Sequence, residues 1–167
     1  MLTKLRYVGV SIEDLIEIYC LFIRSRAEYM SVLWHSSLSI EQSEKIENIQ
    51  RTCLKIILQD NYVNYLAACE MTGLFDLSVR CQARCLQFAK RSLNNPLTRG
   101  MFPENTQSHH NIRETEKYVV NFASTENYKN SSVPFCQRLL NKDIFDRKNK
   151  DGVSNKKQNG TRRRGEH

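Results

Sequence analysis

The sequence contains few of the residues that form phosphate-cradling loops. Its 167 residues include only six glycines and three prolines. No glycine-rich segment completes a Walker-type loop or a paired-glycine cradle, and no glycine elbow presents a serine nucleophile. We therefore predict neither nucleotide-dependent nor serine-type chemistry, and we expect no cofactor and no small-molecule substrate.

The sequence also lacks a long apolar run. The longest, IYCLFI at 18–23, has six residues, far below the ~20 that a transmembrane helix needs. No apolar segment follows a basic N-terminal start, as it would in a secretory signal. We therefore predict a soluble, intracellular protein of the nucleus or cytoplasm, with reduced thiols and no membrane partner.

Positive charge is present in excess but is unevenly distributed. The net charge is +7 and the isoelectric point is about 9.2. Residues 142–167 hold nine basic and four acidic residues, which gives +5 and leaves +2 for residues 1–141. A basic balance favours anionic partners such as nucleic acid, and most of it belongs to the C-terminal tail.

Six cysteines and four histidines are the residue types best suited to metal binding. Cys81 and Cys85 lie one helical turn apart, with His109 and His110 downstream. Structural zinc sites usually pair cysteines as C-x2-C on a tight turn, whereas two cysteines on the apolar side of a helix pack as small hydrophobic residues. We predict core packing and no metal site.

His35 is the most plausible catalytic base, because it lies between Trp34 and the pair Ser36-Ser37. Nucleophilic catalysis needs a nucleophile, a base and an orienting group held together, and no oxyanion-type loop accompanies this histidine. No pair of carboxylates is separated as two-metal chemistry requires. We predict no catalytic residue, and an enzyme that uses His35 is the least favoured interpretation.

Helical periodicity dominates the first half of the chain. Ser11 caps a helix that is apolar on nearly every side, bends near Ser25 and resumes to Trp34, so we expect it to be buried. Ser39 and Gln42 form a capping box for an amphipathic helix over residues 40–58.

Two further helices follow. A short one at 63–72 is closed by Gly73, which suits a left-handed C-cap. Asp76 opens another, which stops before Asn95-Pro96 because a residue that precedes proline is disfavoured in helical geometry.

The periodicity weakens after Pro96. YVVNFA at 118–123 is a candidate strand, and Pro134 begins a short helix that ends at Leu140. Residues 142–167 contain too few apolar side chains to offset the entropy of ordering, so we expect a disordered basic tail. The fold class is all-α, with a helical domain at 1–95, an extended connector with a short helix at 96–141, and the tail.

Basic residues recur on the polar faces of two of the predicted helices. Arg80, Arg84 and Arg91 lie at i, i+4 and i+11 on the later helix, and Lys45, Arg51 and Lys55 lie on the earlier one. Such arrays are suited to phosphate contacts, which make affinity depend on salt. An ordinary solvated helix face has the same spacing.

Several blocks of the sequence occur in an order known from one family. They include FIRSRAEYM at 22–30, WHSSL at 34–38, EQSEKIENIQRTCLKIIL at 41–58, NYVNYLAACEMTGLFDLSVRCQARCLQFAKR at 61–91 and YKNSSVPFCQRLLNK at 128–142. In order and spacing, residues 2–142 resemble the region that follows the catalytic palm in jockey-type, LINE-like reverse transcriptases of non-LTR retrotransposons, which are RNA-directed DNA polymerases.

The resemblance implies a helical thumb and connector that grips a template–primer duplex through its backbone. It also implies that the palm, with its paired aspartates, would precede Met1, so we expect no polymerase activity from this chain alone. Two positions depart from the family pattern, because Arg26 stands where an apolar residue is usual and Gln59 where a glycine is usual. We interpreted Arg26 as lying on a packed face, with Glu28 pointing elsewhere.

Our principal prediction is thus a thumb-like helical bundle that lacks the palm and contacts RNA or DNA duplex without sequence preference. The residues that we expect to contact nucleic acid are Arg24, Arg51, Lys55, Arg80, Arg84 and Lys90. The alternatives are a helical protein-interaction module, with an exposed apolar patch where the palm would pack, and a non-functional relic of the element.

Overall fold

The computed structural model describes the backbone of residues 1–105 and 116–162, and the side chains of the same ranges as far as Arg147. The described residues form helices joined by loops, and they contain no strand. The predicted all-α class is confirmed. The chain divides into two compact units, Met1–Cys85 and Leu86–His167. The domain boundary that we expected at residue 95 stays a prediction.

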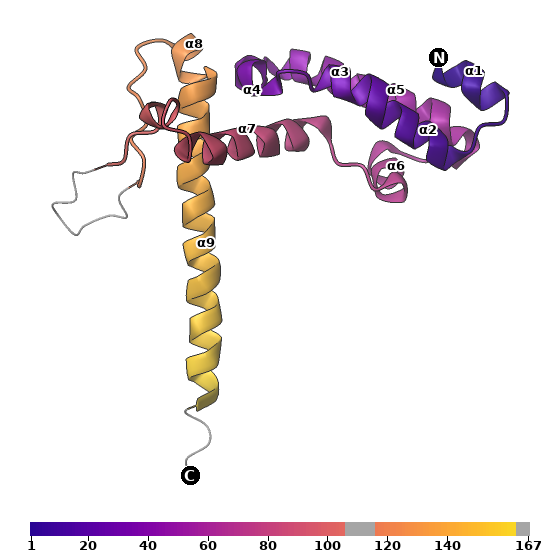
Figure 1. Ribbon diagram of the computed structural model, residues 1–167. Coiled ribbons are helices and arrows are strands. Elements are labelled where there is room, and N and C mark those ends of the chain that lie inside the picture. The colour runs from indigo at the N-terminus through magenta and orange to yellow at the C-terminus, as the bar shows by residue number, and fades with distance from the viewer. Residues whose placement is uncertain (106–115, 163–167) are drawn as a thin grey trace. The chain divides into compact units, whose positions relative to one another are not determined.

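The first unit is built from short helices around one long helix (Figure 1). Its elements are α1 (Leu2–Tyr7), α2 (Ile12–Ile18), the π-helix η1 (Tyr19–Arg24), α3 (Ser25–Ala27), α4 (Ser31–Trp34), the 3₁₀-helices η2 (His35–Ser37) and η3 (Gln59–Asn61), α5 (Ile40–Leu58), α6 (Tyr65–Thr72) and the first part of α7 (Leu77–Leu93).

The core of this unit lies between α5 and the helices that pack on it, α1, α2 and α6. Leu15, Tyr19, Leu54 and Ile57 are completely buried there. α5 begins as the sequence predicts, because the Ser39 hydroxyl accepts from the Gln42 N–H and the Gln42 side chain accepts from the Ser39 N–H. Removing these apolar side chains from water is the main source of stability.

The helical segment from Ile12 to Trp34 differs from the prediction in two ways. It breaks at Glu28–Met30, where Met30 has a φ of 52°, a break that we did not predict. It is also not buried on all sides, because Leu21 is 60% and Phe22 59% exposed. Because these apolar side chains face solvent, the prediction that this helix is buried on nearly every side is wrong.

The turns after α5 and α6 match the sequence closely. α5 ends at Leu58, and Gln59 follows with a φ of 46°, the conformation that a glycine at this position would adopt with less strain. Gly73, with a φ of 65°, closes α6 as a left-handed C-cap. The predicted ends of both helices are confirmed.

The second unit contains the remainder of α7, the 3₁₀-helix η4 (Arg99–Met101), α8 (Glu126–Lys129) and α9 (Ser132–Arg162). Two side-chain amides of α9, Gln137 and Asn141, bond the backbone of the non-helical segments of this unit. Gln137 is buried, donates from Nε2 to the Met101 carbonyl at 2.7 Å and accepts from the Asn121 N–H at 2.9 Å. Asn141 bonds both the N–H and the carbonyl of Tyr118 at 2.9 Å.

The strand that we considered for residues 118–123 does not form. Tyr118 makes one isolated antiparallel bridge with Glu104, and the following residues up to Ala123 take no strand conformation. The backbone of Tyr118 and Asn121 bonds side chains of α9, and the Val119 N–H donates to the Pro103 carbonyl, so these groups do not form the regular ladder of a strand.

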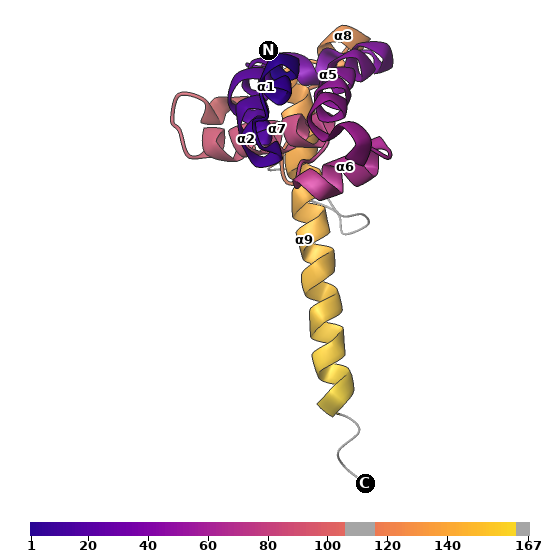
Figure 2. The same ribbon diagram turned by 90° about the vertical axis from the view of Figure 1, so that its right-hand side faces the viewer.

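The last helix is longer than predicted, as Figure 2 shows for α9. It continues past Leu140, and Asp143 contributes to this extension by pairing with Lys90 at 2.9 Å and with Arg147, one turn on, at 3.1 Å. The predicted end of this helix at Leu140 is therefore corrected, since α9 is described to Arg162, and the disordered tail stays a prediction. Residues 163–167 of that tail lie outside the described residues.

Candidate nucleic-acid interface

Three of the predicted basic residues converge on one buried carboxylate. Glu28 is 1% exposed and lies at the break between α3 and α4. Arg80 donates to it from Nε at 2.6 Å and from a terminal nitrogen at 3.3 Å. A terminal nitrogen of Arg84 lies 2.7 Å from its other oxygen, and Arg24 Nε lies 4.0 Å away. We call these four residues the Glu28 cluster.

Helix periodicity brings the arginines together. Arg80 and Arg84 lie one turn apart on α7, and Arg24 lies one turn before Glu28, so each pair shares a helix face. The hydrogen bond that Arg80 donates to Glu28 is the main reason that the pKa of Arg80 is raised above its usual value. Three guanidinium groups around one carboxylate leave the cluster with a formal charge of +2.

The structure corrects our interpretation of Arg26. Arg26 is exposed rather than packed, so its charge carries no burial cost. Glu28 does point away from it, as we expected, but toward Arg80 and Arg84, more than 50 positions along the chain. No sequence pattern predicts this pairing, because residues on two different helices that contact each other have no fixed spacing along the chain.

Two further predicted contact residues lie over aromatic rings of the same unit. The Arg51 guanidinium is 5.1 Å from the centre of the Tyr65 ring and also bonds Asn48. Lys55 Nζ is 5.6 Å from the centre of the Tyr62 ring. These cation–π contacts hold the two basic groups one turn apart on α5.

Lys90 is the one predicted contact residue in the second unit. Its ammonium pairs with Asp143 at 2.9 Å, and its side chain is 38% exposed. The other five predicted residues belong to Met1–Cys85, and three of those five are in the Glu28 cluster.

A neutral polar cluster that we did not predict surrounds Gln50, a buried residue of α5. Gln50 is fully buried, accepts from the Tyr19 hydroxyl at 2.8 Å, and donates to the Tyr65 hydroxyl at 2.8 Å and to the Phe75 carbonyl at 3.1 Å. The Tyr65 hydroxyl also donates to Glu47. Burial raises the pKa of both tyrosines. The Gln50 Nε2 also lies 3.8 Å from the Cys69 Sγ. We call Gln50 and its oxygen partners Tyr19, Tyr65 and Phe75 the Gln50 cluster.

A signal for this cluster was present in the sequence. Gln50 falls four residues after Ile46 and three before Cys53, on the apolar face of a helix. A glutamine at such a position must find partners for both its donor and its acceptor.

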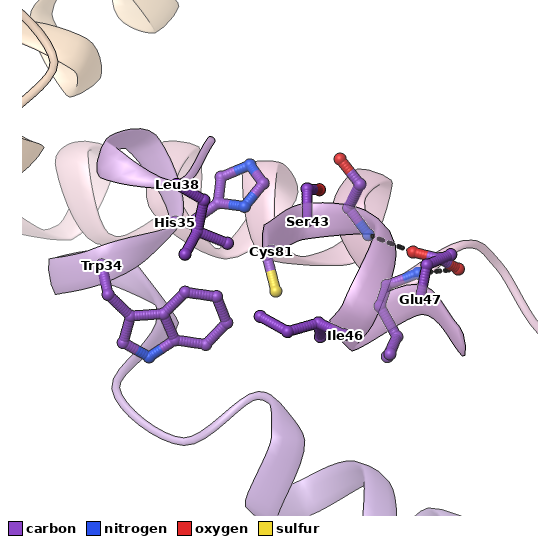
Figure 3. A pocket seen from close by; sticks show the side chains of 9 residues that line it. Trp34, His35, Leu38, Ser43, Ile46, Glu47 and Cys81 are labelled. Atoms are coloured by element: carbon purple, nitrogen blue, oxygen red, sulfur yellow. Dashed lines mark hydrogen bonds between the residues drawn. The ribbon is translucent and has the colours of Figure 1, made fainter. Parts of the chain in front are cut away.

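Glu47 also binds the start of α7. Its carboxylate accepts from the Leu77 N–H at 3.1 Å and the Ser78 N–H at 3.3 Å, as the dashed lines in Figure 3 show. A carboxylate at this position satisfies free N–H groups and opposes the positive end of the helix dipole. α7 begins directly after Asp76, as predicted, but its first N–H groups are bound by a different acidic residue from another helix.

His35, the candidate catalytic base, and Cys81, one of the candidate metal ligands, line a small cavity of about 10 Å³. It is lined by Trp34, His35, Ile46 and Cys81 among others, and the Cys81 thiol points into the space between Trp34 and Ile46 (Figure 3). Such a volume holds about one water molecule and no substrate.

Burial favours the uncharged form of both the Cys81 thiol and the His35 imidazole. Burial raises the pKa of the Cys81 thiol, which keeps it in the weakly nucleophilic protonated form. Burial lowers the pKa of His35. Cys81 and Cys85 are both buried, which confirms their predicted place in the core.

The described part of the chain holds no group of three or more His, Cys, Asp or Glu side chains placed to bind a metal ion. His109 and His110, which we considered as ligands, lie outside the described residues. Within the same described part, no helix combines the length and apolar character that crossing a membrane requires.

Comparison of the chain with protein-family models, with curated proteins and with solved structures gave no match.

Proposed function

We propose that this chain is a thumb-and-connector module of the kind that follows the palm in jockey-type, LINE-like reverse transcriptases, and that it binds nucleic-acid backbone without reading sequence. The observation that carries the proposal is the Glu28 cluster, in which two net positive charges are held at a partly exposed surface. Phosphate groups are the complementary partner for such a charge.

The family resemblance and this cluster support each other. All four residues of the Glu28 cluster fall within the blocks that carry the resemblance, FIRSRAEYM and LSVRCQARC. A module of this kind supplies contacts to a duplex and no chemistry, because the catalytic aspartates of the family belong to the palm. We therefore propose no polymerase activity for the chain on its own.

The test is the salt dependence of duplex binding by the full chain. Fluorescence anisotropy with a labelled ~20 bp RNA–DNA duplex is measured between 50 and 200 mM salt, where affinity is expected to fall steeply because each phosphate contact releases counterions. A flat response, or no binding at low salt, contradicts the proposal. Primer extension by the purified chain would contradict the absence of polymerase activity.

A second candidate, a protein-interaction module, is favoured by one observation. Five large apolar residues between positions 21 and 33 are 52–72% exposed: Leu21, Phe22, Tyr29, Met30 and Leu33. An interaction module with these residues at its surface is expected to self-associate as concentration rises, and the change Phe22→Ser should reduce that association in sedimentation velocity. A chain that stays monomeric and binds duplex would favour the first candidate.

A further inference from the structure

The ion pairs of the Glu28 cluster have an unusual distribution of exposure. The carboxylate is 1% exposed, whereas the side chains of Arg24, Arg80 and Arg84 are 17%, 28% and 45% exposed. In the Lys90–Asp143 pair of the second unit the two sides differ much less, at 38% and 22%. The Glu28 cluster thus buries its negative charge and leaves its positive charges at the surface.

We propose that Arg80 and Arg84 bind one phosphodiester group of a nucleic-acid strand, and that Glu28 is the positioning residue that orients them. This inference rests on the function proposed above and assigns it to one site. Arg80 binds Glu28 through two nitrogens and Arg84 through one. Because an arginine has five N–H donors, donors of both side chains remain for a second acceptor.

Anchoring by Glu28 lowers the cost of binding. A free arginine side chain loses about 2 kcal/mol of rotamer entropy when it is fixed, and these two are already fixed by the carboxylate. Folding therefore orients the guanidinium groups before any ligand arrives, which is the usual effect of preorganisation.

The charge balance allows a phosphate to bind without displacing Glu28. The cluster carries three positive charges and one negative charge, so it remains at +1 after one phosphodiester has bound. The buried carboxylate also occupies the inner side of the guanidinium groups, and Arg84 offers its exposed side to a strand.

The first experiment compares two arginines that differ only in their place in the structure. Arg84→Gln is expected to reduce the slope of log affinity against log salt by at most about 0.9, the value for one phosphate contact, because Arg80 still faces the same phosphate, and to weaken duplex binding by up to about eightfold at 0.1 M salt. Arg26→Gln removes the same charge from an exposed position that belongs to no ion pair among the described residues, and its slope should match wild type. Equal slopes for wild type and a folded Arg84→Gln variant would overturn the inference.

The second experiment separates positioning from simple attraction. Glu28→Gln adds one net positive charge, so attraction alone predicts tighter binding. Loss of positioning predicts binding that is several-fold weaker at the same salt concentration, in a variant whose circular dichroism is unchanged. Tighter binding would overturn the positioning role. If Glu28→Gln does not fold, Arg84→Lys replaces it: retaining the charge should restore the salt slope that Arg84→Gln loses, and failure to restore it overturns the phosphate contact.

These outcomes are distinct from failure of the proposed function. If wild type binds no duplex, the function itself is wrong. If wild type binds duplex with the expected salt slope and Arg84→Gln does not change it, only the assignment to Arg80 and Arg84 is wrong. Binding to phosphatidylserine vesicles that depends on Arg84, without duplex binding, would overturn the nucleic-acid partner.

Discussion

The first unit contains two buried polar clusters that solve the same packing problem in different ways. Gln50 and Glu28 are both essentially inaccessible to solvent and each joins distant parts of the chain. Gln50 is neutral, and its partners are two hydroxyl groups and a carbonyl. Glu28 is surrounded by three cations. Gln50 connects α5 to Phe75, and Glu28 connects the α3–α4 turn to Arg80 and Arg84 of α7.

The two clusters differ in whether their contribution to stability is enough to explain them. A neutral buried amide needs only satisfied hydrogen bonds, each of which contributes about 1 kcal/mol. Burying a carboxylate costs several kcal/mol, and an apolar replacement of a whole ion cluster is often as stable. The Glu28 cluster is therefore a costly way to pack a turn. Unlike the neutral cluster, it holds two arginine side chains in fixed positions at the surface.

The largest expected effect comes from removing the carboxylate. Glu28→Ala leaves three arginines around a partly buried site without their counter-charge, so the free energy of unfolding should fall by about 3–5 kcal/mol in urea titration. The control Arg26→Ala should stay within about 0.5 kcal/mol of wild type, because that side chain is exposed. A loss below about 1 kcal/mol for Glu28→Ala would mean that the ionic cluster holds nothing together.

The neutral cluster should give a smaller effect. Gln50→Ala leaves the Tyr19 hydroxyl and the Phe75 carbonyl without this partner and opens a cavity, for an expected loss of about 2–3 kcal/mol. Gln82→Ala, at an exposed position of α7, is the matched control and should be nearly neutral. If Gln50→Ala costs more than Glu28→Ala, the ranking of the two clusters is reversed.

The side-chain amide of Asn141, in the second unit, bonds the backbone of a single residue and should give a smaller effect than either cluster. Asn141→Ala removes two hydrogen bonds to the backbone of Tyr118, and should cost about 1–2 kcal/mol. The Tyr118 amide proton should also exchange with solvent about tenfold faster. Lys142→Ala, at the exposed neighbouring position, should leave that exchange rate unchanged, and equal rates in the two variants would contradict the role of Asn141.

Local features of the fold were predictable because their causes are local. The Ser39–Gln42 capping box, the Gly73 C-cap and the apolar face of α5 each depend on residues within about one turn. The break at Met30 and the exposure of Leu21 and Phe22 were not predictable in this way, because they depend on which elements pack around η1.

The site was predictable only in part, for a similar reason. Spacing placed Arg80 and Arg84 on one face of a helix, and the structure agrees. Spacing did not predict that their partner is Glu28, since Glu28 precedes Arg80 by 52 positions and the helices α4, α5 and α6 lie between them. The same limit hid Glu47, which binds the start of a helix 30 residues further on.

The smallest expected effect concerns a group that burial keeps uncharged. Burial lowers the pKa of His35 from its ordinary value of 6.5, so the unfolded chain takes up a proton that the folded chain resists. The contribution of this histidine is complete above pH 6.5 and is lost as the pH falls from 6.5 toward the lower folded-state pKa.

Unfolding titrations at pH 7.5 and 5.5 test the contribution of His35 to stability. His35→Gln cannot take up the proton, so its stability should decline less between the two pH values than that of wild type. Carboxylates titrate alike in both proteins, which makes the difference between the two declines specific to position 35. Equal declines would show that the folded chain accepts the proton on His35 without cost, and that burial beside Trp34 does not oppose a charge there.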